Sequence, residues 1–197
     1  MARDRRCPWA LSTDDYLGYH DEEWGRPVLD GNVLFERLCL EAFQSGLSWL
    51  TILRKREGFR AAFAGFRIEE LARFGERDVE RLLGDAAIVR NRAKIEAAIQ
   101  NAGAARELGG PRAFSDLVWS FRPTGRRAAP RAMSELAAET GESKALAREL
   151  KSHGFRFVGP TTAYALMQAC GLVNDHLAGC PVRRAVERER RAALSRS

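Results

Sequence analysis

The chain has 197 residues, of which 45% are hydrophobic, and it carries 32 Lys and Arg against 26 Asp and Glu, a net charge of +6. This length fits one domain or two tightly packed lobes, and four cysteines are too few for the disulfide framework of a small secreted protein. The N-terminal segment has no apolar stretch typical of a signal peptide, and no apolar run approaches a membrane span. We therefore expect a cytoplasmic protein with reduced cysteines and no membrane contact.

Helical periodicity dominates the chain. Asp30 is a helix N-cap residue ahead of apolar residues at helical spacing, and Gly46 is a stop signal at the far end of that helix. No stretch alternates clearly enough to predict a strand, so we expect an all-α fold. The predicted helices cover residues 32–45, a segment that starts near 48, and residues 68–74, 76–83, 91–108, 113–121 and 143–152.

Two later segments are not assigned to these predicted helices. Residues 122–131 are rich in Arg, Pro and Gly, which predicts an exposed connector between two lobes. Residues 184–197 form a basic tail that is either frayed or helical, and they hold much of the positive charge. That charge is compatible with a phosphate-bearing partner but is weak evidence alone. We expect residues 1–183 to form a single domain of two helical lobes with a pocket between them.

A turn between two helices follows Gly154. Gly159 permits close backbone approach, and Pro160 suits a first helical position. The amides from Gly159 through Thr161 to Thr162 would then form an anion-binding helix N-terminus. The segment resembles the second half of a helix-hairpin-helix, which holds a DNA strand by its phosphates. It departs from that pattern at Phe157, where the motif has glycine, and an ordinary helix–helix corner is an equally good reading.

Two pairs of metal-ligand residues stand far apart in the chain. Cys7 and His20 lie near the start, and His176 and Cys180 lie near the end. Two thiolates and two imidazoles are a ligand set that tetrahedral zinc prefers, and neither pair is a complete zinc finger. If the pairs meet, the metal joins the two ends of the fold. The alternative is that these residues occur by chance, as buried thiols or helix-end histidines do. Cys39, Cys170 and His153 are assigned those ordinary roles.

The N-terminal part contains most of the chain's Trp and Tyr residues and one unusual carboxylate. Glu41 lies in an apolar helical run, where a carboxylate is costly unless it is paired or used. Aromatic rings and a carboxylate can hold a flat, electron-poor or cationic ring. Alternatively, the aromatic residues are ordinary core, and Glu41 faces solvent or pairs with an arginine. The aromatic residues concerned are Trp9, Tyr16, Tyr19, Trp24 and Trp49.

Read together, these segments resemble one known family, the bacterial 3-methyladenine DNA glycosylase I enzymes of alkylation repair. The resemblance runs from about Arg6 to Cys180. Its blocks are Arg6-Cys7-x-Trp9, Tyr19-His20-Asp21-x-Glu23-Trp24-Gly25, Leu40-Glu41, Gly46-Leu47-Ser48-Trp49, Val118-Trp119-Ser120-Phe121, Phe157-Val158-Gly159 and Met167-Gln168-Ala169-Cys170-Gly171-Leu172-Val173-Asn174-Asp175-His176.

The resemblance implies a helix-hairpin-helix glycosylase fold with one structural Zn²⁺ per chain. Its metal ligands fall on Cys7, His20, His176 and Cys180. The resemblance also implies a base pocket in which Glu41 hydrogen-bonds the adenine edge, Tyr19 and Trp49 contact the ring, and Trp9, Tyr16 and Trp24 line the walls. Leu47 falls where such enzymes insert an apolar plug into the base stack.

The implied activity is hydrolysis of the N-glycosidic bond of 3-methyladenine in alkylated DNA, with release of the free base. Methylation makes the base cationic and a good leaving group, so the enzyme must chiefly flip the nucleotide, hold the base and admit water. The hairpin contains no Lys for a lyase reaction, which predicts a monofunctional enzyme that leaves an abasic site. Asp175 lies where wider helix-hairpin-helix glycosylases place an aspartate, but the closer family is not thought to use it. The implied partner is double-stranded DNA with alkylated purines, and we expect a monomer without an obligate protein partner.

Two other classes of function compete with this interpretation. A zinc-stapled helix-hairpin-helix protein without catalysis would bind DNA and release no base. A hydrolase or deaminase would use the zinc chemically, but no C-x-x-C motif is present, and four protein ligands leave no position for water.

Overall fold

The computed structural model describes residues 5–125 and 127–195, and every regular element within these ranges is a helix. The elements in chain order are η2 (Pro8–Leu11), α1 (Asp14–Glu22), α2 (Gly31–Gln44), α3 (Trp49–Ala62), η3 (Ala64–Phe66), α4 (Ile68–Leu71), α5 (Glu76–Gly84), α6 (Arg92–Glu107), α7 (Gly110–Ser120), η4 (Met133–Glu135), α8 (Gly141–Ser152), α9 (Pro160–Ala169) and α10 (Arg183–Leu194). The all-helical prediction is confirmed for the described residues. None of their helices is long and apolar enough to cross a membrane.

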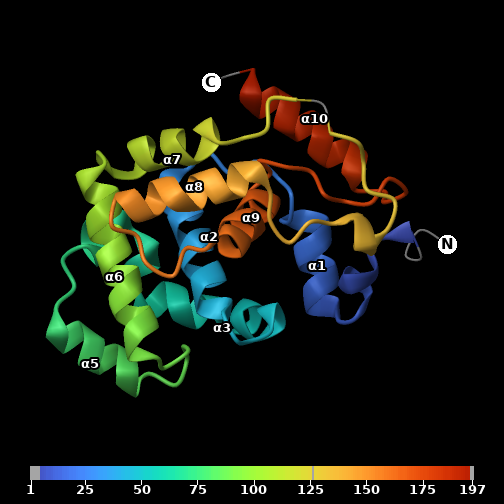
Figure 1. Ribbon diagram of the computed structural model, residues 1–197. Helices are drawn as coiled ribbons and strands as arrows, with labels where there is room; N and C mark the ends of the chain where they lie inside the picture. Colours follow the sequence, from blue (N-terminus) through green and yellow to red (C-terminus); the bar gives the residue numbers. More distant parts are fainter. Residues whose placement is uncertain (1–4, 126, 196–197) are drawn as a thin grey trace.

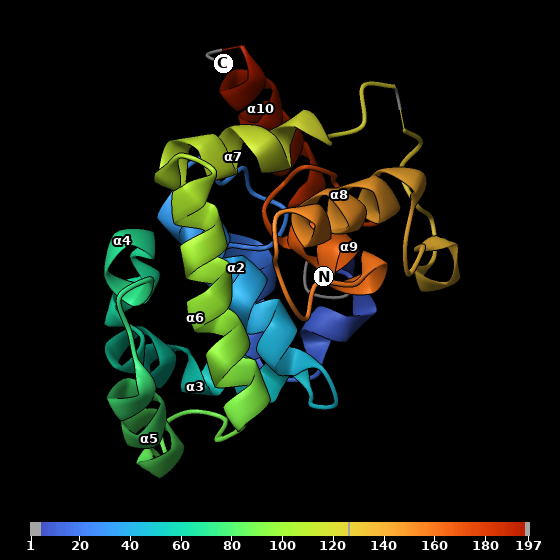
Figure 2. The same ribbon diagram turned by 60° about the vertical axis from the view of Figure 1, so that its left-hand side comes forward.

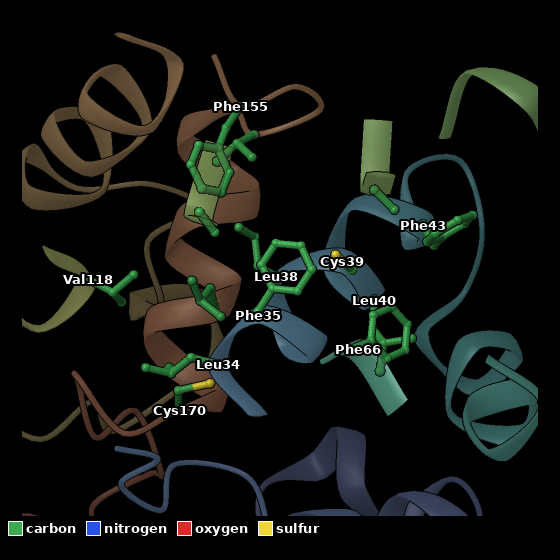
Figure 3. Close-up of a cluster of buried hydrophobic side chains, with 14 of the residues drawn as sticks. Leu34, Phe35, Leu38, Cys39, Leu40, Phe43, Phe66, Val118, Phe155 and Cys170 are labelled. Atoms are coloured by element: carbon green, nitrogen blue, oxygen red, sulfur yellow. The ribbon is translucent and has the colours of Figure 1, made fainter. Parts of the chain in front are cut away.

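Helix α2 is the centre of the fold. It packs against α3, α6, α7 and α9, and every residue from Leu34 to Phe43 is buried (Figure 1). Figure 3 shows its apolar side chains in one cluster with Phe66, Val118 and Phe155 from other helices and turns. A helix covered on all sides normally carries only apolar residues. The buried charged residues of α2 therefore need a partner or a function.

Most predicted helices are present with ends shifted by a few residues. The largest shifts are at α4, which ends at Leu71 instead of residue 74, and at α7, which begins at Gly110 instead of residue 113. The early start of α7 follows from Gly109, whose left-handed φ of 114° marks the boundary, and from Pro111, which suits the first turn. The predicted core positions of Cys39 and Cys170 are confirmed, because both thiols are fully buried.

The apolar pattern predicts no helix ahead of residue 32, whereas the structure has η2 and α1 there. The signals for α1 are local and polar. The Thr13 side chain accepts a hydrogen bond from the Tyr16 amide, and Asp14 and Asp15 lie in the positive first turn. Apolar periodicity is weak in this segment, so a search for an amphipathic pattern misses it.

Helices α8 and α9 form a helix–turn–helix unit whose turn is held by α6. The Asn101 amide donates to the carbonyl of Arg156 at 3.0 Å and accepts from the Arg156 amide at 2.7 Å. Phe157 adopts a left-handed φ of 55°, the conformation that a glycine would take without strain. Phe157 thus takes a backbone conformation that glycine favours, at the position where the expected pattern has glycine.

Of the residues expected as a basic tail, 184–194 belong to α10 and Ser195 is its C-cap, while residues 196 and 197 lie outside the described ranges. Val186 is fully buried, and the Arg190 guanidinium donates to the carbonyls of Gly171 and Leu172. Helix α10 and α5 lie at opposite ends of the molecule in both views (Figures 1 and 2). The connector after α7 is irregular as predicted, with residue 126 outside the described ranges.

Candidate active site and metal centre

A cavity of about 370 Å³ lies among η2, α1, α2, α3 and α9. This volume is within the range of small-molecule sites. It brings together all six residues that the sequence analysis assigned to a base pocket. The lining residues are Trp9, Ser12, Tyr16, Tyr19, Trp24, Glu41, Gln44, Trp49, Ala165 and Gln168.

Local structure fixes the aromatic walls. Tyr16 and Tyr19 are three residues apart on α1 and so lie on one face of the helix. The Tyr16 hydroxyl accepts a hydrogen bond from the Leu50 amide at 2.9 Å, which ties α1 to the first turn of α3. Trp49 is the first residue of α3, and the Ser48 side chain caps that helix. The entry of α3 is therefore held from two sides.

The rings contact one another at angles that suit aromatic pairs. Trp9 meets Tyr16 edge-on with centroids 5.7 Å apart and Trp24 edge-on at 5.2 Å. Tyr19 and Trp49 lie at 5.4 Å in a tilted arrangement. Such pairs favour a defined geometry beyond simple burial of area. The cavity walls are therefore preformed.

Glu41 is a buried carboxylate without a partner. Its side chain lines the cavity, the residue is 8% exposed, and no described residue donates a hydrogen bond or forms an ion pair with it. Burial raises its pKa to about 8, although the charge of Arg37 acts against this. Both alternative interpretations of Glu41 are wrong, because it neither faces solvent nor pairs with an arginine. The nearby Arg37 guanidinium instead pairs with Glu23, which also binds Arg56.

The indole of Trp49 is likewise unsatisfied. Its Nε1 is buried and has no hydrogen-bond acceptor among residues 5–125 and 127–195. Leaving a buried donor unpaired costs about 1 to 3 kcal/mol. The Trp49 donor and the Glu41 acceptor line the same cavity, and unpaired polar groups in an apolar cavity are typical of a ligand-binding site.

The four predicted metal ligands also meet. Cys7, His20, His176 and Cys180 are buried, and their ligand atoms all lie within 4.8 Å of one another. The His20 Nε2 to His176 Nδ1 distance is 3.1 Å, and the Cys180 Sγ lies 3.6 Å from the first atom and 3.7 Å from the second. The Cys7 Sγ lies 3.9 Å from His176 Nδ1. This buried cluster of two thiols and two imidazoles can bind a metal ion.

The outer nitrogens of both imidazoles are held in place. His20 Nδ1 lies 2.8 Å from Asp21 Oδ1, and His176 Nε2 lies 3.0 Å from the carbonyl oxygen of Trp24. Each acceptor calls for an N–H on the outer nitrogen, so each inner nitrogen keeps a lone pair that points into the cluster. In metal-bound histidines, the ring nitrogen that does not bind the metal usually donates such a hydrogen bond.

The cluster and the cavity share walls. The Trp9 ring lies 5.3 Å from the His20 ring, and the Trp24 ring lies 4.7 Å from the His176 ring. Both tryptophans line the cavity. Whatever holds the histidines in place therefore also fixes two cavity walls.

Two exposed features lie outside the cavity. The N-terminus of α9 begins at Gly159 without a side-chain cap, so its first amides are free. Thr161 and Thr162 lie in that first turn. Leu47 is 42% exposed in the turn between α2 and α3, directly after Gly46 with its φ of 81°. A free helix N-terminus suits an anion, and an exposed leucine on a tight turn suits an apolar contact.

The family model for methyladenine glycosylase matches residues 9–184. The chain belongs to the methyladenine glycosylase family. It is 49% identical over 181 residues to DNA-3-methyladenine glycosylase 1 of Escherichia coli strain K12, which covers 89% of this chain and 95% of that protein.

Solved structures agree with this family assignment. A crystal structure of 3-methyladenine DNA glycosylase I matches with a TM-score of 0.84 at 46% identity, over 89% of this chain and 98% of the other. A tyrosine-to-phenylalanine variant of such an enzyme, solved in complex with 3-methyladenine, matches with a TM-score of 0.82 at 34% identity, over 90% and 96% of the two chains.

For this methyladenine glycosylase family member, sequence reasoning missed four cavity residues. Ser12, Gln44, Ala165 and Gln168 line the cavity but were not assigned to it. Ala165 and Gln168 are three residues apart on α9, so helical spacing from the predicted helix start at Pro160 could have placed both on one face. The other two carry no comparable signal. Most of α10 lies beyond the residues that the family model matches.

Proposed function

We propose that this protein hydrolyses the N-glycosidic bond of 3-methyladenine in alkylated DNA, releases the free base and leaves an abasic site. The observation that carries the proposal is the preformed aromatic cavity with an unpaired carboxylate, Glu41, and an unpaired indole donor, Trp49. The family relationship supports the same reaction, because relatives at 44% to 49% identity are named DNA-3-methyladenine glycosylases. This is the first step of base-excision repair of alkylation damage.

In this proposal the cavity binds the flipped base by charge and ring contacts. Glu41 accepts hydrogen bonds from the amino edge of adenine and offsets the positive charge of the methylated ring. Tyr19 and Trp49 contact the ring faces, where cation–π attraction adds to stacking. Trp9, Tyr16 and Trp24 complete the walls. An unmodified base is disfavoured less by its shape than by its lack of positive charge.

The chemical step needs little assistance from a strong acid. The C1′–N9 bond breaks and its electron pair neutralises the cationic base, so the leaving group requires no proton. Water forms the new C1′–O bond as the base departs, and it gives up a proton. Within the described residues, no lysine lines the cavity, which supports a monofunctional hydrolase.

This role for Glu41 predicts a pH dependence. The pKa of Glu41 in the empty cavity is about 8, so the carboxyl is mostly protonated at pH 6 and mostly ionised at pH 9. A cationic base selects the ionised form. We expect kcat/KM for 3-methyladenine release to rise about tenfold or more from pH 6 to pH 9, since this parameter follows the titration of the free enzyme. Rates measured at constant ionic strength check this, and the Glu41→Gln variant should give a flatter profile.

We propose that the cluster of Cys7, His20, His176 and Cys180 holds one structural Zn²⁺. Tetrahedral zinc with ligand distances of about 2.0 to 2.3 Å sets its ligand atoms roughly 3.3 to 3.8 Å apart, close to the spacing in the cluster. A hydrogen bond with Cys7 lowers the pKa of the Cys180 thiol, which favours the thiolate form that binds a metal. Four protein ligands leave no open position, so a metal-catalysed deaminase or hydrolase is disfavoured.

We propose that α8 and α9 act as a helix-hairpin-helix that binds one DNA strand by its phosphates. The free amides at Gly159, Thr161 and Thr162 are the phosphate contacts. Leu47 acts as the plug that fills the gap left by the flipped nucleotide. The net charge of +6 supports a DNA partner. The proposal requires no protein partner, and a monomer in the cytoplasm is our expectation.

Removing the plug should slow flipping in duplex DNA. We expect Leu47→Ala to reduce release from methylated duplex DNA about tenfold, because an alanine cannot fill the space of the lost base. Release from methylated single-stranded DNA, where less stacking must be broken, should change by less than about twofold. Leu29→Ala is the matched control, since Leu29 is equally exposed at 43% but precedes α2, at the opposite end of that helix from Leu47. Equal losses on both substrates would argue against a plug.

A base-release assay on methylated duplex DNA, with the free base identified by mass spectrometry, tests the proposed function directly. We expect free 3-methyladenine and abasic sites in equal amounts, without strand cleavage. A non-catalytic DNA-binding protein would bind the same duplex and release nothing. The family relationship does not favour that alternative.

A further inference from the structure

Asp175 is a buried carboxylate that the proposed chemistry leaves without a task. It is 5% exposed, and it does not line the cavity. The Tyr164 hydroxyl donates to its Oδ2 at 2.6 Å, and the Gln168 Nε2 donates to the same oxygen at 2.9 Å. The Arg127 guanidinium approaches Oδ1 at 3.8 Å. Two hydrogen-bond donors and one guanidinium therefore converge on a carboxylate that contacts Gln168, which lines the cavity.

This network fixes the orientation of the Gln168 amide. Asp175 Oδ2 accepts a hydrogen bond from the Tyr164 hydroxyl, and Oδ1 faces the Arg127 guanidinium. The carboxylate therefore acts as an acceptor, so the Gln168 amide must turn its NH₂ group toward it. Its other end, the carbonyl oxygen Oε1, is then the hydrogen-bonding atom left for the cavity that Gln168 lines. An amide in water can flip between the two ends, whereas this one is held in a single orientation.

The position of Gln168 on α9 indicates what the oxygen faces. The N-terminus of α9 is the proposed phosphate contact, and Ala165 and Gln168 of the same helix line the cavity. A flipped nucleotide runs from its phosphate through its sugar to its base. The cavity-facing side of α9 therefore follows the sugar. Glu41 and Trp49, from α2 and α3, already supply an acceptor and a donor for the base.

We propose that the carbonyl oxygen of Gln168 orients the water that attacks C1′, and that Asp175 and Tyr164 are positioning residues that hold this amide. The inference rests on the proposed glycosylase function and deepens it. The water oxygen forms the bond to C1′ as the C1′–N9 electron pair leaves with the base. Gln168 accepts a hydrogen bond from the water but is not basic enough to take its proton, which passes to solvent.

The test compares Gln168→Met with the wild-type protein in single-turnover release of 3-methyladenine from methylated duplex DNA. Methionine keeps the length of the side chain and removes the amide. We expect the release rate to fall on the order of 10-fold to 100-fold, as misplacement of a reacting group does. The Kd of free 3-methyladenine should stay within about twofold. Asp175→Asn and Tyr164→Phe should lower the rate less, with zinc content measured for each because Asp175 precedes a cluster residue.

A nucleophile competition separates a positioned water from a general structural effect. With methanol added, the wild-type protein should form mainly the hydrolysed sugar, whereas Gln168→Met should form a larger share of the methyl glycoside at C1′. If the wild-type protein releases 3-methyladenine and Gln168→Met matches its rate, the inference is wrong and the proposed function stands. An unchanged methanol share, or a loss of base affinity that accounts for the slower rate, also overturns it. No release by the wild-type protein overturns both proposals.

Discussion

Replacing Glu41 by Gln should slow 3-methyladenine release about 100-fold and at the same time stabilise the free protein. The expected loss of rate follows from removing Glu41, the one carboxylate among the described residues that line the cavity, and removing a single well-placed electrostatic group typically costs this much. Glutamine has nearly the same shape, so the cavity should persist. The opposite signs of the two effects make this the most informative single variant.

The expected stabilisation follows from linkage between protonation and folding. Burial raises the folded-state pKa of Glu41 to about 8, well above its value near 4.5 in the unfolded chain. Between these values the folded state binds the extra proton, so stability falls as the pH rises from about 4.5 to 8. At pH 7 the penalty is on the order of 3 kcal/mol, because each pH unit in this window corresponds to about 1.4 kcal/mol. The glutamine side chain of the Glu41→Gln variant never ionises, so the variant avoids this penalty.

Thermal unfolding at several pH values measures this effect, and Glu36→Gln is the matched control. Glu36 is on the same helix and equally buried, but it pairs with Arg60. Its replacement should leave base release unchanged and lower the melting temperature, because it removes a paired buried charge. The difference in stability between Glu41→Gln and the wild-type protein should grow from pH 5 to pH 8. If Glu41→Gln is fully active, the base-pocket assignment is wrong.

Replacing Cys180 by Ser should abolish metal binding and cause the largest loss of stability among single changes in this chain. A structural metal that closes a long loop contributes several kcal/mol to folding. For a domain of this size, a loss of about 4 kcal/mol lowers the melting temperature by roughly 10 °C. Metal analysis should find one zinc per wild-type chain and none in the variant. Base affinity should fall as well, because Trp9 and Trp24 pack on the histidine rings of the cluster.

Cys39→Ala separates loss of metal from loss of a buried thiol. Cys39 is equally buried, but it lies in the apolar core away from the cluster. This control should keep its zinc and lose only the modest stability of a small cavity. A chelator should lower the melting temperature of the wild-type protein and of Cys39→Ala, and leave Cys180→Ser unaffected. An unaltered metal content in Cys180→Ser would refute the proposed zinc ligand set.

The sequence predicts the parts of this molecule that local pattern controls. Apolar spacing and the Asp30 cap predict α2, and Gly159 with Pro160 predicts the start of α9. The four clustered Cys and His residues and the six assigned cavity residues meet as expected. Helix α1 escaped prediction because its signal is a Thr13 cap and acidic first turn without a strong apolar face. The contact of Gln168 with Asp175 escaped because it depends on how the chain turns after α9, which no local spacing reports.

The position of the Cys and His cluster has a consequence for protein synthesis. Cys7 and His20 leave the ribosome early, but the cluster cannot form before His176, which follows Cys7 by 169 residues, has also been synthesised. Until that histidine emerges, Trp24 lacks the ring against which it packs, and one side of the cavity stays unfinished. The cavity is therefore completed only when the last part of the polypeptide packs against the first.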